Sequence, residues 1–179
     1  GHSLLLASSI PTIQTYDTAF GYEITTIIKD GLKRMYVDNE AIYYYLTLGN
    51  ENYEMPSMPK GVERGILNGL YPFKRVTKKT AKASVNILAS GSLVNEAILA
   101  QQDLLKKYSI GSIVWCVTNY KRLREESLEA DRYNLLYPKK KQKESYLQKT
   151  LKSVKGPFVA VSDNMKMVSD QVYQWVPGG

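Results

Sequence analysis

Hydrophobic and polar positions in the first third of the chain predict a strand, a helix and a second strand. The apolar run 4–13, LLLASSIPTI, reads as a strand that ends at Pro11. Asp17 is a candidate N-cap for the helix that follows. Apolar residues then recur at helical spacing and predict one core-facing stripe, made of Phe20, Ile24, Ile28, Leu32 and Met35. The aromatic segment 41–47, AIYYYLT, predicts the second strand.

Periodicity fails between residue 50 and about residue 82. The segment 50–61, NENYEMPSMPKG, contains two prolines and two methionines and favours neither a helix nor a strand. The stretch VERGILNGLYPF could form one helical turn, but glycines at 61, 65 and 69 interrupt it. We therefore interpret residues 55–81 as an interdomain connection.

A regular alternation of strands and helices begins after this connection. Strands are predicted at 84–90, 112–118 and 157–163, and the central one, SIVWCVT, has no polar alternation, as expected for a strand buried on both faces. A tight turn, GSL, follows the first strand. Helical patterns occupy the intervals after the strands, at 94–108, 124–138, 144–154 and 167–176. This order is typical of a parallel sheet with right-handed crossovers, hence of a three-layer α/β domain.

The two patterns together predict two unequal parts. Residues 1–54 hold too few elements to cover both faces of a sheet, so we expect them to be the tail of one α/β domain. Residues 82–179 would form most of a second, truncated α/β domain.

Composition places the chain among globular proteins. Its 179 residues are 44% hydrophobic, which is ample for a core, and no run of about 18 apolar residues predicts a membrane span. No signal peptide is recognisable at the N-terminus. The single cysteine, Cys116, lies in an apolar run, so we expect a buried structural thiol in a protein of the reducing cytoplasm.

The formal net charge of +7 allows an anionic partner, but the lysines are scattered. They cluster only at 74–82, KRVTKKTAK, and at 138–143, PKKKQK. Both clusters adjoin proline or threonine between periodic segments, so we favour solvated loops over a nucleic-acid-binding patch. Zinc-finger, helix-turn-helix and ribonucleoprotein signatures are missing, and we predict no nucleic-acid partner.

Few residues offer recognisable chemistry. His2 is the only histidine, so a histidine-based catalytic site would need this terminal residue, and a site of several His or Cys metal ligands is impossible. The turn 90–92, SGS, could present N–H groups to an anion, but we favour an ordinary strand-to-helix turn. Asp163 and Asn164 follow the last strand, and we favour a helix cap there over a ligand site.

Two blocks of the sequence carry a family resemblance. They are IPTIQTYDTAFGYEITTIIKDGLKRMY and YYYLTLGNENYEMPSMPKGVERGILNGLY. They resemble the homodimeric first component of the bacterial pyruvate dehydrogenase complex, a thiamine-diphosphate-dependent member of the transketolase-like superfamily. The segments ILASGSLVNEAILAQQDLLKKYSIGSIVWCVTNYKRL, DRYNLLYP and FVAVSDNMKMVSDQVYQWVP are similar to later family segments, so the resemblance spans nearly the whole chain.

The resemblance implies roughly a fifth of a large enzyme that decarboxylates pyruvate oxidatively and passes the acetyl unit to a lipoyl group. The full-length family uses thiamine diphosphate and Mg²⁺, whose ligands would lie upstream, so this chain alone is expected to be inactive and to bind neither. Residues 1–54 would end the pyrimidine-binding domain, and 82–179 would form the transketolase-like C-terminal domain. The implied setting is a cytoplasmic homodimer with no membrane contact, and the implied partners are pyruvate and a dihydrolipoyl acetyltransferase.

The resemblance also marks two residues as catalytic. Tyr16 matches a family tyrosine that hydrogen-bonds the substrate-derived intermediate, and a phenol can donate to a developing oxyanion, although a packing role is an equal alternative. Glu54 occupies a place where some members have an active-site histidine, and an ionised carboxylate cannot donate in its stead. Residues 50–52 would fix the loop. The alternative function is a non-catalytic α/β interaction or dimerisation module.

Overall fold

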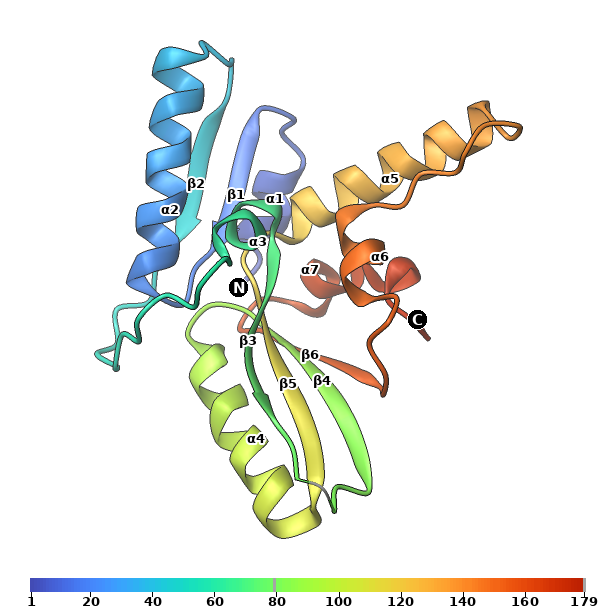
Figure 1. Cartoon of the computed structure of the whole chain (residues 1–179). Coiled ribbons are helices and arrows are strands. Elements are labelled where there is room, and N and C mark those ends of the chain that lie inside the picture. The colour runs from blue at the N-terminus through green and yellow to red at the C-terminus, as the bar shows by residue number, and fades with distance from the viewer. Residues whose placement is uncertain (79, 179) are drawn as a thin grey trace.

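The computed structural model describes residues 1–78 and 80–178, and it contains two sheets (Figure 1). Tyr16 of one parallel strand lies opposite Leu46 of the other in the smaller, two-stranded sheet. The elements of this first region are α1 (Ser3–Ser8), β1 (Ile13–Asp17), α2 (Gly21–Leu32), a π-helical turn (Lys33–Val37) and β2 (Tyr43–Thr47).

The second sheet has four strands in the order β3-β5-β4-β6. Strands β4, β5 and β6 are parallel, while β3 runs antiparallel to β5 at one edge. The elements of this region are α3 (Glu63–Asn68), β3 (Leu70–Val76), β4 (Ala83–Ala89), α4 (Leu93–Tyr108), β5 (Ile110–Val117), α5 (Tyr120–Leu136), α6 (Tyr146–Leu151), β6 (Phe158–Val161), α7 (Lys166–Asp170) and a 3₁₀ turn (Tyr173–Trp175). The predicted mixed α/β fold with a mostly parallel sheet is confirmed.

Helices cover both faces of the four-stranded sheet. Successive residues of β5 alternate between two hydrophobic clusters, as the period of a strand requires, with Trp115 in one and Cys116 in the other. One cluster packs under α5, α6 and α7. The other packs under α4 and also contains Tyr16, Phe20 and Ile27 of the first region, so the two regions share a core.

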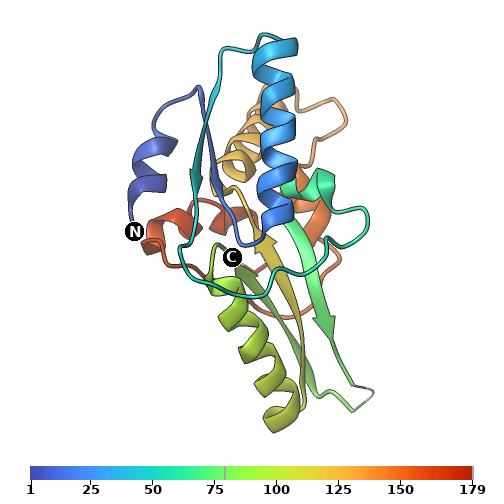
Figure 2. The same ribbon diagram turned by 90° about the vertical axis from the view of Figure 1, so that its left-hand side faces the viewer.

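The expected strand at 4–13 is wrong, because residues 3–8 form the short helix α1 and β1 begins only at Ile13 (Figure 2). Leu4 and Ala7 point into the protein from one face of this helix, while Leu6 is 65% exposed. A short apolar run such as LLLA fits a helix or a strand equally well, so its type is decided by tertiary contacts.

The helix after β1 exists, but two details of its prediction are wrong. Its N-cap is Phe20, and Asp17 instead ends β1. The buried face consists of Glu23, Ile27 and Gly31, whereas Ile28 and Leu32 of the predicted stripe are about half exposed. Gly31 lies against Tyr44 of β2, where an added Cβ would be 3.0 Å from the ring. This close approach fits a helix orientation in which Phe20 of the predicted stripe is buried and Ile28 and Leu32 face outward.

The region between residues 50 and 82 is more ordered than its sequence suggests. It supplies α3 and the edge strand β3, which pairs with β5 through Leu70 and Val117. The glycine after α3, Gly69, has φ of +100° and ends that helix. The domain limits 1–54, 55–81 and 82–179 stay predictions. No helix of the described residues is long and apolar enough to cross a membrane.

Candidate functional site at the junction of the two sheets

Asp17 lies where the carboxyl ends of strands from both sheets come together. Figure 1 shows the two sheets side by side at this junction. The carboxylate of Asp17 accepts hydrogen bonds from the hydroxyl of Thr47, at the end of β2, at 2.6 Å, and from the side-chain amide of Asn164, beyond β6, at 3.1 Å. The backbone N–H of Asp17 donates to the carbonyl of Thr118, beyond β5, at 2.8 Å. In α/β proteins this end of the strands is where ligands bind.

The turn after β4 closes around the same carboxylate. Gly91 has φ of +57°, and a Cβ there would be 2.9 Å from Oδ1 of Asp17. Burial raises the pKa of Asp17, with hydrogen bonds from Thr47 and Ser90 acting in the opposite direction. The turn 90–92 therefore faces a carboxylate, which opposes an anion site. The expected cap at Asp163 and Asn164 is wrong, since α7 begins at Lys166 with Met165 as its N-cap.

Tyr16, the first predicted catalytic residue, is a core residue next to this junction. Its side chain is 1% exposed, and its ring lies parallel to that of Tyr44 with 6.0 Å between centroids. Its hydroxyl donates to the backbone carbonyl of Leu67 at 3.0 Å. Burial raises the pKa of Tyr16 to about 12, so the phenol is protonated at neutral pH and able to donate. Its catalytic role stays a prediction.

Glu54, the second predicted catalytic residue, is exposed on a segment without helix or strand, 48–59. Its neighbour Tyr53 anchors that segment, because the Tyr53 hydroxyl donates to the carbonyl of Ala19. Tyr16 is therefore buried and Glu54 is exposed to solvent, and no hydrogen bond joins the two side chains among the described residues. The role of Glu54 also stays a prediction.

Glu23 is a fully buried carboxyl group that the sequence did not single out. Its Oε2 accepts from the backbone N–H groups of Ala19 and Phe20 at 2.6 and 3.1 Å. Its Oε1 accepts from the hydroxyl of Tyr71, on β3, at 2.6 Å. Burial raises the pKa of Glu23, and the hydroxyl of Tyr71 and these N–H groups act against that rise. Glu23 thereby ties the start of α2 to the second sheet.

Lys121 forms a second buried link between the regions. Its ammonium group, from the first turn of α5, donates to the carbonyls of Ile10 and Ile13, each at 2.7 Å. The side chain is 4% exposed, and Glu125 lies 3.6 Å away as its acidic neighbour. These bonds hold the loop before β1 on α5, so β1 is fixed at both of its ends.

The described residues do not fit a metal-diphosphate site, which needs converging carboxylate and amide oxygens. They contain no group of three or more His, Cys, Asp or Glu side chains that could hold a metal ion. Cys116 is 1% exposed, and burial raises the pKa of its thiol, which fits the predicted structural role. His2 is exposed near the N-terminus. No step of a reaction is therefore assigned to a cofactor on this chain.

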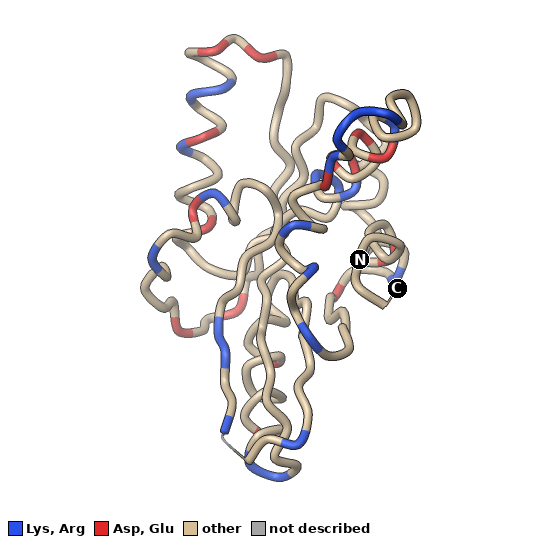
Figure 3. Tube along the Cα trace, turned by 45° about the vertical axis from the view of Figure 1, so that its right-hand side comes forward, with Lys and Arg blue, Asp and Glu red and all other residues tan. Residues whose placement is uncertain are grey.

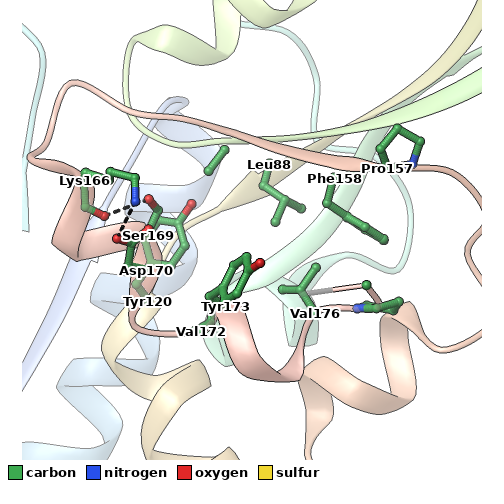
Figure 4. A pocket seen from close by; sticks show the side chains of 13 residues that line it. Leu88, Tyr120, Pro157, Phe158, Lys166, Ser169, Asp170, Val172, Tyr173 and Val176 are labelled. Carbon is green, nitrogen blue, oxygen red and sulfur yellow. Dashed lines mark hydrogen bonds and ion pairs between the residues drawn. The ribbon is translucent and has the colours of Figure 1, made fainter.

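A groove of about 930 Å³ lies away from the junction, beside β6 and the C-terminal 3₁₀ turn (Figure 4). Its lining is mostly apolar and includes Leu88, Phe158 and Tyr173, with the ion pair of Lys166 and Asp170 at one end. Neither Tyr16 nor Glu54 reaches it. The one hydroxyl of a serine in the described lining, that of Ser169, donates to the backbone carbonyl of Lys166 rather than to a base, so the groove offers binding surface rather than catalytic chemistry.

Two family models match consecutive parts of the chain. Residues 69–177 match the family model described as the transketolase-like C-terminal domain, which is more than half of the chain. The chain belongs to the transketolase-like family. Residues 1–56 match the model described as the middle domain of the pyruvate dehydrogenase E1 component. The suspected resemblance is thus confirmed by both matches, in the order in which they occur along the sequence.

Curated relatives of this transketolase-like chain are pyruvate dehydrogenase E1 components. The one from Pseudomonas aeruginosa is 42% identical over 177 residues, which is 99% of this chain and 20% of the relative. Those from Mycolicibacterium smegmatis and Escherichia coli K12 are 41% and 39% identical over 180 and 178 residues, again 99% of this chain. The chain therefore spans about one fifth of the length of these relatives.

Solved structures with the same fold are transketolases. The enzyme from Campylobacter jejuni matches with a TM-score of 0.61 at 18% identity. This match covers 98% of the present chain and 22% of the transketolase chain. The Leishmania mexicana enzyme has a TM-score of 0.56 at 15% identity, over 93% of this chain and 20% of its own. At this identity the likeness concerns the fold alone.

Sequence reasoning missed Asp17 as a junction residue and Glu23 as a buried link. Both carried a recognisable signal. Asp17 is the last residue of a strand in an α/β pattern, the position where polar side chains gather. Glu23 is the third residue of α2, from where a carboxylate reaches back to free N–H groups of the helix start.

Proposed function

We propose that this chain is part of a pyruvate dehydrogenase E1 component that decarboxylates pyruvate oxidatively and transfers the acetyl unit to a lipoyl group of an acyltransferase. One observation carries the proposal: identity of 42% to the Pseudomonas aeruginosa E1 component over 99% of this chain. Within such an enzyme, the chain would form the end of the middle domain and most of the C-terminal domain.

Within the enzyme we assign substrate contact to Tyr16. Its hydroxyl is protonated at neutral pH, and a backbone carbonyl is its present acceptor, so a developing oxyanion could replace that carbonyl. Asp17 and Glu23 would act as positioning residues, because their hydrogen bonds hold both sides of the turn that follows Tyr16. Glu54, on its exposed loop, would line the entrance to the active site of the whole enzyme.

Thiamine diphosphate and Mg²⁺ would be bound by other parts of the enzyme, where the cofactor supplies the electron sink for decarboxylation. We further propose a cytoplasmic homodimer. We call Ile28 and Leu32 the α2 stripe; they are 49% and 50% exposed, Tyr36 in the following π-helical turn is 75% exposed, and this apolar surface supports burial against another surface.

A chimera tests the proposal. The matching 177 residues of the Pseudomonas aeruginosa E1 component are replaced by this chain. Pyruvate-dependent reduction of ferricyanide is then measured with thiamine diphosphate and Mg²⁺ present. The chimera should keep activity, and Tyr16→Phe should lower kcat by about tenfold or more while leaving the thermal midpoint nearly unchanged.

The control variant is Tyr108→Phe, which removes the same hydroxyl from a 64% exposed ring at the end of α4 and should leave kcat unchanged. A chimera that folds and forms dimers, yet has no activity, would contradict the proposed function. If kcat is equal in Tyr16→Phe and in the parent chimera, the assignment of Tyr16 fails while the enzyme role stands.

The second candidate function is a non-catalytic interaction module, and the α2 stripe is the observation that favours it. The chimera distinguishes the two functions. A module that had lost its catalytic contribution would support dimerisation of the chimera but not turnover.

A further inference from the structure

The outer end of α5 and the loop after it project from the rest of the protein (Figure 1). We call residues 133–143 the α5 tip. Leu135 is 82% exposed and Leu136 is 58% exposed, which is unusual for adjacent large apolar side chains. Blue segments mark positive charge at this end of the protein in Figure 3, where the sequence places Lys139, Lys140, Lys141 and Lys143.

The α5 tip is an ordered structure rather than a loose loop. The side chain of Asn134 bonds the returning chain twice, donating to the carbonyl of Lys143 at 2.9 Å and accepting from its N–H at 2.7 Å. The ammonium group of Lys143 lies 3.8 Å from the ring centroid of Tyr133, and that of Lys140 lies 4.5 Å from the ring centroid of Tyr137. A surface fixed in this way loses little conformational entropy when it binds a partner.

The lysines of the tip lie near acidic side chains, because Glu126, Glu129 and Glu144 line a groove together with Lys141 and Lys143, but among the described residues they form no ion pair with them. In the parts of the chain that the structure describes, none of the ion pairs involves a lysine of the tip. Four lysines that form no ion pair within the described chain, close to two exposed leucines, combine electrostatic steering with an apolar anchor, the two features that protein interfaces use together.

We propose that the α5 tip is a docking surface for an acidic segment of another protein, with apolar side chains on Leu135 and Leu136 and carboxylates against the lysines. Nucleic acid fits poorly, since lysines already occupy faces of the Tyr133 and Tyr137 rings that bases would stack on. Binding to an anionic membrane is the outcome of the test below that would reassign the tip. The proposal does not depend on the proposed enzymatic role.

The test uses the whole 179-residue chain and a soluble, fluorescein-labelled peptide of glutamate and leucine. Fluorescence anisotropy should report saturable binding that weakens with salt, and a matched peptide of glutamine and leucine should bind at least about tenfold more weakly. Leu135→Ser with Leu136→Ser should weaken binding about tenfold or more. Lys139→Glu with Lys141→Glu should have a similar effect and also reduce the dependence on salt.

The matched control combines Leu99→Ser and Lys106→Glu on α4, where Leu99 is 57% exposed, and should bind like the parent. Circular dichroism verifies that each variant is folded. Absence of binding to the glutamate peptide, or equal binding by the tip variants and the control, would overturn the proposal. Tip-dependent binding to phosphatidylcholine–phosphatidylserine vesicles without peptide binding would also overturn it and assign the tip to membranes.

Discussion

The two sheets differ in how completely they are covered. In the four-stranded sheet, β5 is buried from Gly111 to Val117 and helices pack on both faces. In the two-stranded sheet, Tyr43 is 49% exposed, and the covering helix α2 turns Ile28 and Leu32 outward. Parallel strands are usually covered on both faces, and two strands alone are marginally stable. The first sheet therefore depends on its neighbour.

The shared contacts explain how the smaller sheet persists. Phe20 and Ile27 pack into the same cluster as residues of β4, β5 and α4. Glu23 and Lys121 add buried polar links between the regions. Because Tyr16 lies in the less covered region, its position is set by these links rather than by its own sheet. Substitutions at the junction should therefore destabilise the first region more than the second.

Among substitutions at the junction of the two sheets, loss of the Glu23 carboxyl group should lower the free energy of unfolding most. Glu23→Ala leaves the Tyr71 hydroxyl and two backbone N–H groups without their acceptor inside the protein. We expect the free energy of unfolding to fall by about 3 kcal/mol, measured by urea denaturation. The exposed helical residue Glu129 is the control, and Glu129→Ala should change the free energy of unfolding by less than about 0.5 kcal/mol. Equal effects of the two substitutions would show that Glu23 does not stabilise the contact between the two regions.

Lys121→Met should cause the second-largest loss in the free energy of unfolding. The substitution keeps the length of the side chain but leaves the carbonyls of Ile10 and Ile13 without a donor, so we expect a loss of about 2 kcal/mol. Lys166→Met serves as the matched control, because that side chain is 86% exposed and its ion pair with Asp170 should contribute less than about 0.5 kcal/mol. A loss no larger than that of the control would show that the loop before β1 is held without Lys121.

Gly91→Ala should have a smaller effect, of about 1 to 2 kcal/mol. The new Cβ would require a left-handed conformation and would lie 2.9 Å from the Asp17 carboxylate. Gly21→Ala is the counterpart, since a Cβ at this helical position meets nothing within 4 Å and should be neutral or stabilising. Thermal denaturation of both variants measures the difference, and a stabilising Gly91→Ala would contradict the close junction.

The smallest expected effect is that of Glu23→Gln on how the free energy of unfolding depends on pH. Burial raises the pKa of Glu23 in the folded protein. Between the ordinary and the raised pKa the native state binds more protons than the unfolded state, so the free energy of unfolding falls as pH rises through this window. Glu23→Gln should flatten that part of the profile relative to the parent, measured by urea denaturation from about pH 7 down to about pH 4. An unchanged slope would mean that Glu23 titrates normally.

The second region was largely predictable because its elements are local and strongly periodic. The pattern from Val94 to Tyr108 matches α4, and the uninterrupted apolar run at 112–118 matches the buried strand β5. The edge strand β3 was not predictable, since Pro72 lies inside it and its alternation is weak. Its pairing with β5 decides its conformation, and that contact is remote in the sequence.

The first region was predicted less well for a related reason. The apolar stripe with Ile28 and Leu32 follows helical periodicity, but the close contact of Gly31 with Tyr44 decides which face of α2 is buried. Family resemblance pointed to Tyr16 and Glu54, whereas the local positions of Asp17 and Glu23 did not reveal which remote residues they contact, Asn164 and Tyr71. Hydrophobic patterning gives no sign of a buried carboxylate, and the partner of Glu23 that links the two regions, Tyr71, is distant in the sequence.

Hydrogen exchange tests the central claim, that the first sheet is held by the second. Exchange of the whole chain at increasing denaturant gives an opening free energy for the amides of β1 and β5. The account predicts that β1 opens at least about 2 kcal/mol below β5, and that Glu23→Ala lowers the value for β1 more than that for β5. Equal opening free energies in both sheets, lowered equally by Glu23→Ala, would contradict it.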